Sequence, residues 1–141
     1  FVIVIDTPPG PSIFLEQTRS ISTLDIVILQ ADATSVSLLP SVESQAFLGR
    51  TPEGARRQVR YVFNLVDMRR KLTRDVTALL RRRLGQAMLG IANYDDRFGE
   101  AVAHQQLVID RAPTSKAAAD VRGLAAAVQG LLVDSMEPEL R

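Results

Sequence analysis

A short polar motif near the start of the chain could bind the phosphates of a nucleotide. Asp6-Thr7-Pro8-Pro9-Gly10 directly follows the apolar run Phe1–Ile5. A carboxylate at the end of a strand, beside a phosphate site, can hold Mg²⁺ directly or through water. Gly10 would let a backbone N–H approach a terminal phosphate, and Pro8 would stiffen the loop. The motif therefore predicts a nucleotide-responsive loop with Mg²⁺ near Asp6, and a plain strand-to-helix turn is the alternative.

A second motif, Asn64-Leu65-Val66-Asp67, closes a later apolar run. An Asn side chain offers both a donor and an acceptor, so Asn64 could read an edge of adenine. Turn capping is the simpler explanation when such a motif stands alone. The position of the motif strengthens the prediction that Asn64 and Asp67 bind the nucleotide. The motif lies about 58 residues after Asp6, at the end of a strand expected in the same sheet.

Positive charge is concentrated in the middle of the chain. Residues 50–83 hold eleven Lys or Arg and three Asp or Glu, a local charge of +8, although the whole chain carries only +1. Such a segment can contact a phosphate lipid, a nucleic acid or an acidic partner. Arg81, Arg82 and Arg83, at the end of a predicted helix, are the candidates for that contact. A solvated helix face whose cations complement the helix dipole is the alternative.

The composition excludes several other kinds of site. The chain has no Cys, hence no disulfide and no cysteine nucleophile, and its single histidine, His104, is expected on the surface. Asp95, Asp96 and Glu100 could suggest a metal site, but carboxylates at a helix start explain them more simply. No apolar run is long enough to cross a bilayer and no signal peptide is visible, so a cytoplasmic setting is expected.

The two motifs need a scaffold of alternating strands and helices to position them. Apolar runs predict three buried parallel strands and two shorter ones: Phe1–Ile5, Asp25–Gln30, Val59–Leu65, Ala87–Ile91 and Leu107–Ile109. Helices are expected between them, over residues 12–22, 36–48, 73–84, 97–105 and 115–133. This order predicts an α/β fold with a mostly parallel sheet flanked by helices, in which ligands bind at the carboxyl ends of the strands.

Capping residues and apolar stripes define the expected helices. Ser12, Thr73 and Ser115 are predicted N-caps, Gly85 is a predicted stop, and Asp75 is a first-turn carboxylate. Pro40 fits a first turn or a kink. Side chains at helical spacing are expected to face the core: Val76, Leu79, Leu80 and Leu84 in one helix, and Ala118, Val121, Leu124, Ala125, Val128 and Leu132 in another.

The motifs together resemble a known family, the ParA/MinD group of deviant P-loop ATPases. The resemblance covers residues 1–133 and is carried by the segments DTPPG, DIVILQADATS, FNLVD and the block from GIANYDDRFGEAVA to APTSKAAADVRGLA. Within that group, NLVDMRRKLTRDVTALLRRRLG, YDDRFGEAVA and APTSKAAADVRGLA are similar to the ATPase encoded with bacterial cellulose synthase, the BcsQ or YhjQ type.

The resemblance implies a P-loop NTPase-like (SIMIBI) fold that binds ATP and Mg²⁺ and dimerises around nucleotide. Asp6 would be the switch carboxylate near Mg²⁺, Gly10 would approach the γ-phosphate, and Asn64 would contact adenine. The loop Ala92-Asn93-Tyr94 would place Asn93 along the base. The chain departs here from relatives that have Pro near this point.

The family's Gly-rich phosphate loop does not occur among these 141 residues. The chain also begins without Met and inside a predicted central strand, so further sequence is expected upstream. Residues 1–133 are then interpreted as the C-terminal part of one ATPase domain, and residues 134–141 as a frayed tail. The parent protein is expected to be an ATPase, whereas the chain alone is expected not to hydrolyse ATP.

Three functions compete at this stage. The first is an ATPase that regulates or localises the cellulose synthesis and secretion complex, acting as an ATP-bound homodimer with components of that complex. Its setting would be cytoplasmic, with peripheral attachment at the inner membrane or the cell pole as an option. The second is a related ATPase that positions other cargo, such as DNA or a polar organelle. The third is a nucleotide-free scaffold that works through protein contacts.

Overall fold

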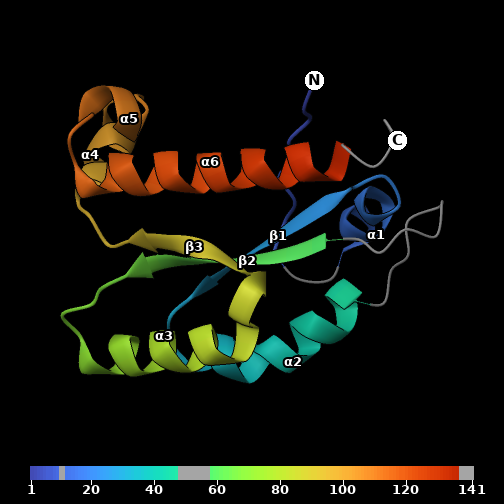
Figure 1. Cartoon of the computed structure of the whole chain (residues 1–141). Helices are drawn as coiled ribbons and strands as arrows, with labels where there is room; N and C mark the ends of the chain where they lie inside the picture. Colours follow the sequence, from blue (N-terminus) through green and yellow to red (C-terminus); the bar gives the residue numbers. More distant parts are fainter. Residues whose placement is uncertain (10–11, 48–57, 137–141) are drawn as a thin grey trace.

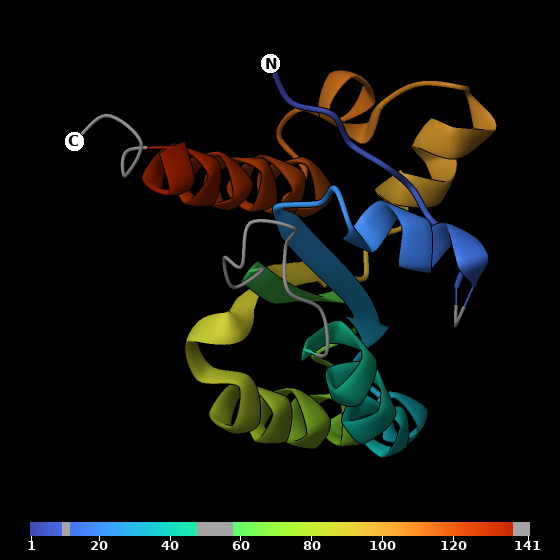
Figure 2. The ribbon, with the colours of Figure 1, turned by 90° about the vertical axis from the view of Figure 1, so that its right-hand side faces the viewer.

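The computed structural model describes residues 1–9, 12–47 and 58–136. Three layers build the molecule (Figure 1). A parallel sheet lies in the middle, the long helix α6 (Lys116–Met136) covers one face, and α2 (Ala33–Phe47) and α3 (Lys71–Leu84) cover the other. Figure 2 shows the same sandwich turned by 90°. The expected α/β fold with a parallel sheet flanked by helices is therefore confirmed.

The sheet has the strand order β1-β2-β3, with β1 at Leu24–Gln30, β2 at Gln58–Val66 and β3 at Met88–Asn93. Both pairings are parallel, so a helical crossover joins each strand to the next. The carboxyl ends of all three strands consequently meet at one edge of the sheet. Three of the predicted strands are confirmed to within two residues at their ends.

The main core lies between the sheet and the two helices α2 and α3. Tyr61 and Phe63 of the central strand are fully buried there, with Leu39 from α2 and Leu80 from α3. Alternation along β2 sends these side chains to one face, and the 3.6-residue period of α3 brings Val76, Leu80 and Leu84 to meet them. This packing fixes the position of β2, whose end carries Asn64 and Asp67.

Helix α6 packs closely on β3 from the other face. Ala117 and Ala118 are fully buried at its start. A Cβ at Gly90 of β3 would lie 2.7 Å from the Cδ2 atom of Leu124. The glycine therefore lets helix and strand approach, and this approach brings the start of α6 to the carboxyl end of β3.

The four remaining elements are short: α1 (Ile13–Arg19), the 3₁₀ turn η1 (Gly85–Ala87), α4 (Arg97–Ala103) and α5 (Val108–Arg111). Three predicted boundaries are confirmed. The hydroxyl oxygens of Ser12 and Ser115 accept hydrogen bonds from the Leu15 and Ala118 N–H groups at 3.2 and 3.1 Å. Gly85 ends α3 with φ at +51°, a left-handed value that suits glycine.

The prediction of a strand at Phe1–Ile5 is wrong. This segment has no regular secondary structure, and all five side chains are exposed. A parallel strand needs a neighbour that completes its hydrogen-bond ladder. Within the described chain β1 pairs only with β2, and Ile28 of β1 is 65% exposed. Strand β1 is therefore an edge of the described sheet and not an interior strand as expected.

The start of α3 and the segment after α4 also differ from expectation. Thr73 is not an N-cap, because α3 begins at Lys71 and Thr73 lies buried within it. Asp75 consequently falls outside the first turn, and Leu79 is 52% exposed instead of facing the core. The predicted strand Leu107–Ile109 is instead the start of α5, whose Val108 packs against Ala101 and Ala117.

Smaller corrections concern helix lengths. Helix α2 starts at Ala33, earlier than expected, and Pro40 lies inside it and not in its first turn. Ala125 of α6 is exposed, although the rest of its predicted stripe is buried or half-buried. Helix α6 continues to Met136, so residues 134–136 are helical, and residues 137–141 lie outside the described part of the chain. In that part, no helix combines the length and apolar character needed to cross a membrane.

Candidate nucleotide site

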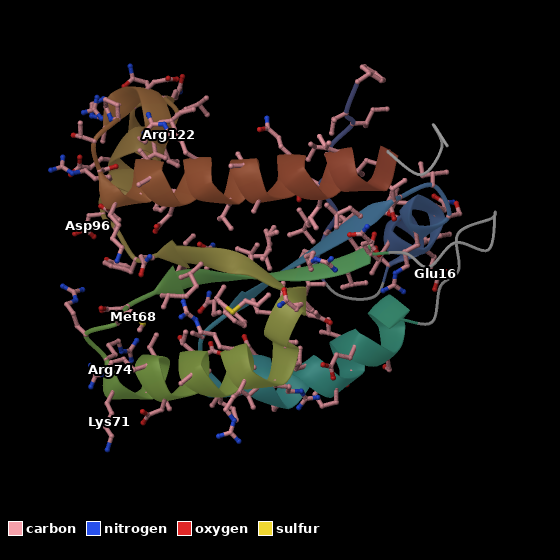
Figure 3. All side chains as sticks on the ribbon, viewed as in Figure 1. Glu16, Met68, Lys71, Arg74, Asp96 and Arg122 are labelled. Carbon is pink, nitrogen blue, oxygen red and sulfur yellow. The ribbon has the colours of Figure 1, made fainter. Side chains whose placement is uncertain are left out.

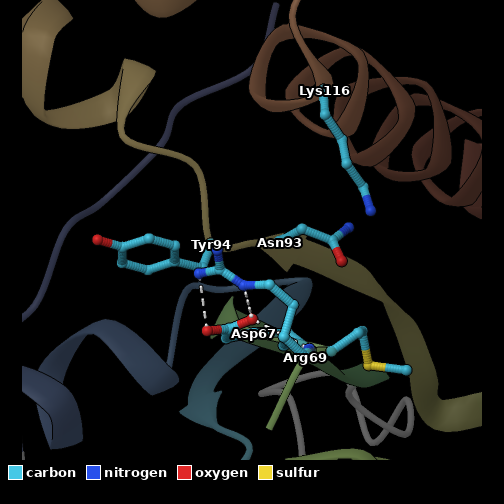
Figure 4. Close-up of a pocket in the computed structure, with 7 residues that line it drawn as sticks. Asp67, Arg69, Asn93, Tyr94 and Lys116 are labelled. Atoms are coloured by element: carbon cyan, nitrogen blue, oxygen red, sulfur yellow. Dashed lines mark hydrogen bonds and ion pairs between the residues drawn. The ribbon is translucent and has the colours of Figure 1, made fainter.

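An open pocket of about 420 Å³ lies where the carboxyl ends of β2 and β3 meet the start of α6 (Figure 4). Ligands of parallel α/β sheets bind at this edge. Seven residues from the two strand ends, the following turns and α6 line the pocket: Val66, Asp67, Met68, Arg69, Asn93, Tyr94 and Lys116. Asp67, Arg69 and Lys116 together give the lining a formal charge of +1, which favours an anionic ligand.

A bulge at the end of β2 aligns the two strand ends. Phe63 pairs with Ile91 and Val66 pairs with Asn93, so β2 advances three residues where β3 advances two. Leu65, within this bulge, adopts the left-handed φ of +55°, which is uncommon for a residue with a side chain. The Tyr94 N–H then donates to the Val66 carbonyl at 3.0 Å, which ties the two strand ends together beside the pocket.

Asp67 and Arg69 form one wall of the pocket. The guanidinium donates from Nε to Oδ1 at 2.8 Å and from Nη2 to Oδ2 at 3.0 Å, a bidentate pair. The side-chain hydrogen bonds from Arg69 lower the pKa of the Asp67 carboxyl, so the carboxyl stays ionised. The same guanidinium lies 5.9 Å from the centre of the Tyr94 ring. Both Asp67 oxygens are therefore engaged by Arg69, which in turn stacks with Tyr94.

Asn93 is held from the other side by α6. The Asp120 Oδ2 atom accepts hydrogen bonds from the Asn93 backbone N–H at 2.8 Å and from its Nδ2 at 2.9 Å. Figure 4 shows the Asn93 amide at the centre of the pocket, below the Lys116 side chain. The pocket thus combines a fixed amide, an aromatic ring and a cation.

Of the acidic side chains after β3, Asp95 serves the helix starts as the sequence indicates, whereas the Asp96 side chain makes no capping hydrogen bond. Asp95 accepts from the Arg97 N–H at 3.0 Å and from the Ala117 N–H at 3.1 Å, so one carboxylate joins the starts of α4 and α6. Asp96 accepts from the Tyr94 hydroxyl at 2.8 Å, which raises the pKa of that tyrosine. Among the described residues no group of three or more His, Cys, Asp or Glu could hold a metal ion. His104 is exposed, as expected.

The link made by Asp95 should depend on pH. Hydrogen bonds, first that from the Arg97 N–H, lower the pKa of Asp95 below its ordinary value of 3.8. Its stabilising effect is therefore complete above that value and is lost as the pH falls through the lower, folded-state pKa. We expect the Ala117 N–H to lose hydrogen-exchange protection below about pH 4, after correction for intrinsic exchange rates. In Asp95→Asn this pH dependence should disappear; its persistence there would contradict the assignment.

The structure brings together only part of the predicted site. Asp67 and Asn93 line one pocket. Asn64 lies near it on β2 but is not part of the lining, and its Oδ1 accepts from the Leu65 N–H at 2.9 Å. Asp6 and Pro8 lie in the exposed segment 1–9, and Gly10 falls outside the described residues. The structure leaves the ligand roles of all six residues as predictions.

Sequence reasoning missed Arg69, Met68 and Lys116 as pocket residues. The D-x-R spacing from Asp67 to Arg69 was a usable signal, because a turn after a strand can fold such a pair together. No sequence pattern indicates Lys116 as a pocket residue, since only the tertiary packing of α6 on β3 brings it there.

The pocket fits the base of a nucleotide better than it fits a metal ion. Its volume lies within the range of about 300–1,000 Å³ that is usual for small-molecule sites, and Tyr94 and Met68 supply apolar surface. For Mg²⁺ the described residues assemble no ligand set, and Asp6 is the only carboxylate in its exposed segment 1–9. The described residues therefore do not form a Mg²⁺ site.

The family model described as cellulose biosynthesis protein BcsQ matches residues 2–128. Comparison with curated proteins gave no significant match.

Proposed function

Because the chain belongs to the BcsQ family of cellulose biosynthesis proteins, we propose that it binds ATP, with the adenine base in the pocket at the ends of β2 and β3. One observation carries this proposal. Asp67 and Asn93, two of the residues predicted from the sequence as nucleotide ligands, line the same pocket although 26 positions separate them. The position of the pocket at the carboxyl edge of a parallel sheet supports it further.

The described side chains would each have a separate task in binding. The Tyr94 ring, with Arg69 beside it, offers a surface on which a planar base can stack. The Asn93 amide offers hydrogen bonds to the edge of the base. The Lys116 ammonium adds positive charge at the pocket and so favours a ligand that carries phosphates.

The cellular role that we propose follows the family. ATP binding would support a homodimer that regulates or localises the cellulose synthesis and secretion complex at the cytoplasmic side of the inner membrane. Family membership and the pocket support this role over a nucleotide-free scaffold. ATP binding by the chain therefore tests the proposal.

Replacing Asn93 by alanine should weaken ATP binding. Loss of one net hydrogen bond costs about 0.5–1.5 kcal/mol, which corresponds to a rise of roughly two- to tenfold in Kd. Titration of the chain with a fluorescent ATP analogue would measure this. Asn64→Ala should have a similar effect if Asn64 also reaches the base, as its type and position predict.

Gln129→Ala is a matched control, because Gln129 is an exposed amide residue on α6 away from the pocket lining. It should leave the Kd unchanged. Wild-type chain that shows no saturable ATP binding, with its fold verified by circular dichroism, would contradict the proposed function. Equal Kd values for wild type and Asn93→Ala would contradict the assignment of the base to this pocket.

We also propose that the outer face of α3 contacts an anionic membrane surface. Helix α3 carries five Lys or Arg and one Asp, and Figure 3 shows Lys71 pointing away from the sheet, whereas Arg74 Nη1 donates to the Met68 and Arg69 carbonyls at 2.9 and 3.0 Å. Arg81 and Arg82 are exposed, whereas Arg83 is paired with Glu43 at 2.6 Å. Leu72 and Leu79, seven residues apart, are 56% and 52% exposed. Exposed apolar side chains on a helix that also carries exposed cations favour a lipid surface over a nucleic acid.

A further inference from the structure

The hydrogen bonds between Asp120 and Asn93 determine which atoms the pocket can offer to a base. An ionised carboxylate only accepts hydrogen bonds, and an amide has one donating and one accepting end. The Asp120 Oδ2 atom lies 2.9 Å from the Asn93 side chain, so the end that faces it must be the NH₂ group. The accepting Oδ1 atom is therefore turned away from Asp120.

The backbone contact makes this orientation rigid. The same Oδ2 atom also accepts from the Asn93 backbone N–H at 2.8 Å, so one oxygen binds both the backbone and the side-chain amide of Asn93. Asp120 is half-buried on the face of α6 that includes Ala117 and Leu124, which packs on β3. Rotation of the Asp120 carboxylate would break both hydrogen bonds, and rotation of the Asn93 amide would break the one from its Nδ2.

The other polar wall of the pocket is also fixed. Both Asp67 oxygens accept from the Arg69 guanidinium, at 2.8 and 3.0 Å. A guanine base needs acceptors for its N1–H and its 2-amino group. Because Arg69 engages both oxygens, this carboxylate is a poor partner for those donors.

Building on the proposed function, we propose that Asp120 sets base selectivity by holding the Asn93 amide with its oxygen toward the pocket. A fixed acceptor favours a purine with a 6-amino group, which donates, and disfavours one with a 6-oxo group, which places a second acceptor opposite the first. Asp120 is then a positioning residue, because it acts on the base only through Asn93. Sites built to bond a donor discriminate strongly against analogues that lack it.

The test measures dissociation constants of the chain for ATP, GTP and purine riboside triphosphate, which lacks the 6-amino group. Wild type should bind ATP most tightly. Asp120→Ala frees the Asn93 amide to rotate, so the preference for ATP over both analogues should fall about five- to tenfold. Asp120→Asn should also lower the preference for ATP, because a carboxamide can hydrogen-bond with either the oxygen or the NH₂ group of the Asn93 side chain.

The ratio of dissociation constants separates positioning from structural damage. A loosened helix α6 would weaken all three nucleotides together, whereas loss of orientation changes the ratios. Asp110→Asn, an exposed Asp on α5 outside the pocket lining, is the matched control and should leave the ratios unchanged. Unchanged ratios in both Asp120 variants would overturn the inference while ATP binding still stands. Absence of ATP binding in wild type would overturn the proposed function, and the inference with it.

Discussion

Replacing Phe63 by alanine is expected to remove most of the stability of the chain. Phe63 is fully buried at the middle of the central strand, in the core that β2 shares with α2 and α3. Truncation of a buried Phe costs about 3–5 kcal/mol, because transfer free energy is lost and a cavity remains. Total stabilities of domains are only about 5–15 kcal/mol, so this change alone could unfold the chain.

Urea denaturation followed by circular dichroism would measure this loss. Leu65→Ala is the control on the same strand, since Leu65 is 47% exposed and its loss should cost less than about 1 kcal/mol. Equal losses in the two variants would mean that the sheet face carrying Phe63 is not the main core. The result also bears on the site, because the same packing holds the end of β2 at the pocket.

The parts of the fold that sequence predicted well have both a local signal and a partner. Strand β2 combines a buried apolar pattern with neighbours on both sides. Helix α6 has a serine cap and an apolar stripe that packs on β3. In these elements propensity, capping and burial agree, and each signal supports the others.

The wrong predictions come from local signals without a tertiary partner. Phe1–Ile5 has strong strand propensity, but it makes no ladder pairing in the described chain. Strand propensity depends on packing and pairing more than helix propensity does. The prediction of an N-cap at Thr73 failed because a turn earlier in the chain starts the helix. The Asp67 carbonyl accepts from the Arg70 N–H at 3.1 Å, and this turn places the N-cap of α3 at Arg70, three residues before Thr73.

The candidate site was predictable only where its residues follow strands. Asp67 and Asn93 end two neighbouring parallel strands, and topology alone brings such positions together. Lys116, which lines the pocket, and Asp120, which binds Asn93, come from α6, and their positions depend on how closely that helix approaches Gly90. A distance of this kind is set by tertiary packing and has no signature in local spacing.

The second large effect, on binding to anionic membranes, is expected at the outer face of α3. Replacing Arg81 and Arg82 by glutamine should weaken binding to vesicles that contain anionic lipid. Each basic residue near such a surface contributes about 1 kcal/mol, so the double variant should bind roughly thirtyfold more weakly. Adding Arg83→Gln should have a smaller further effect, because that guanidinium is already paired with Glu43. Co-sedimentation at several salt concentrations would measure both, and the binding should fall with salt.

Two comparisons test whether the outer face of α3 binds lipid specifically. Arg97→Gln with Arg122→Gln removes two exposed cations from α4 and α6 and should leave vesicle binding intact. Leu79→Ala should weaken binding to vesicles but not to DNA, because only a lipid surface can take up the exposed apolar side chain.

Since exposed charges contribute little to folding, the thermal transition of every Arg variant should stay within a few degrees of wild type. Equal vesicle binding by wild type and the Arg81/Arg82 double variant would mean that these cations are only solvated. Stronger losses on DNA than on vesicles would assign the face to nucleic acid instead.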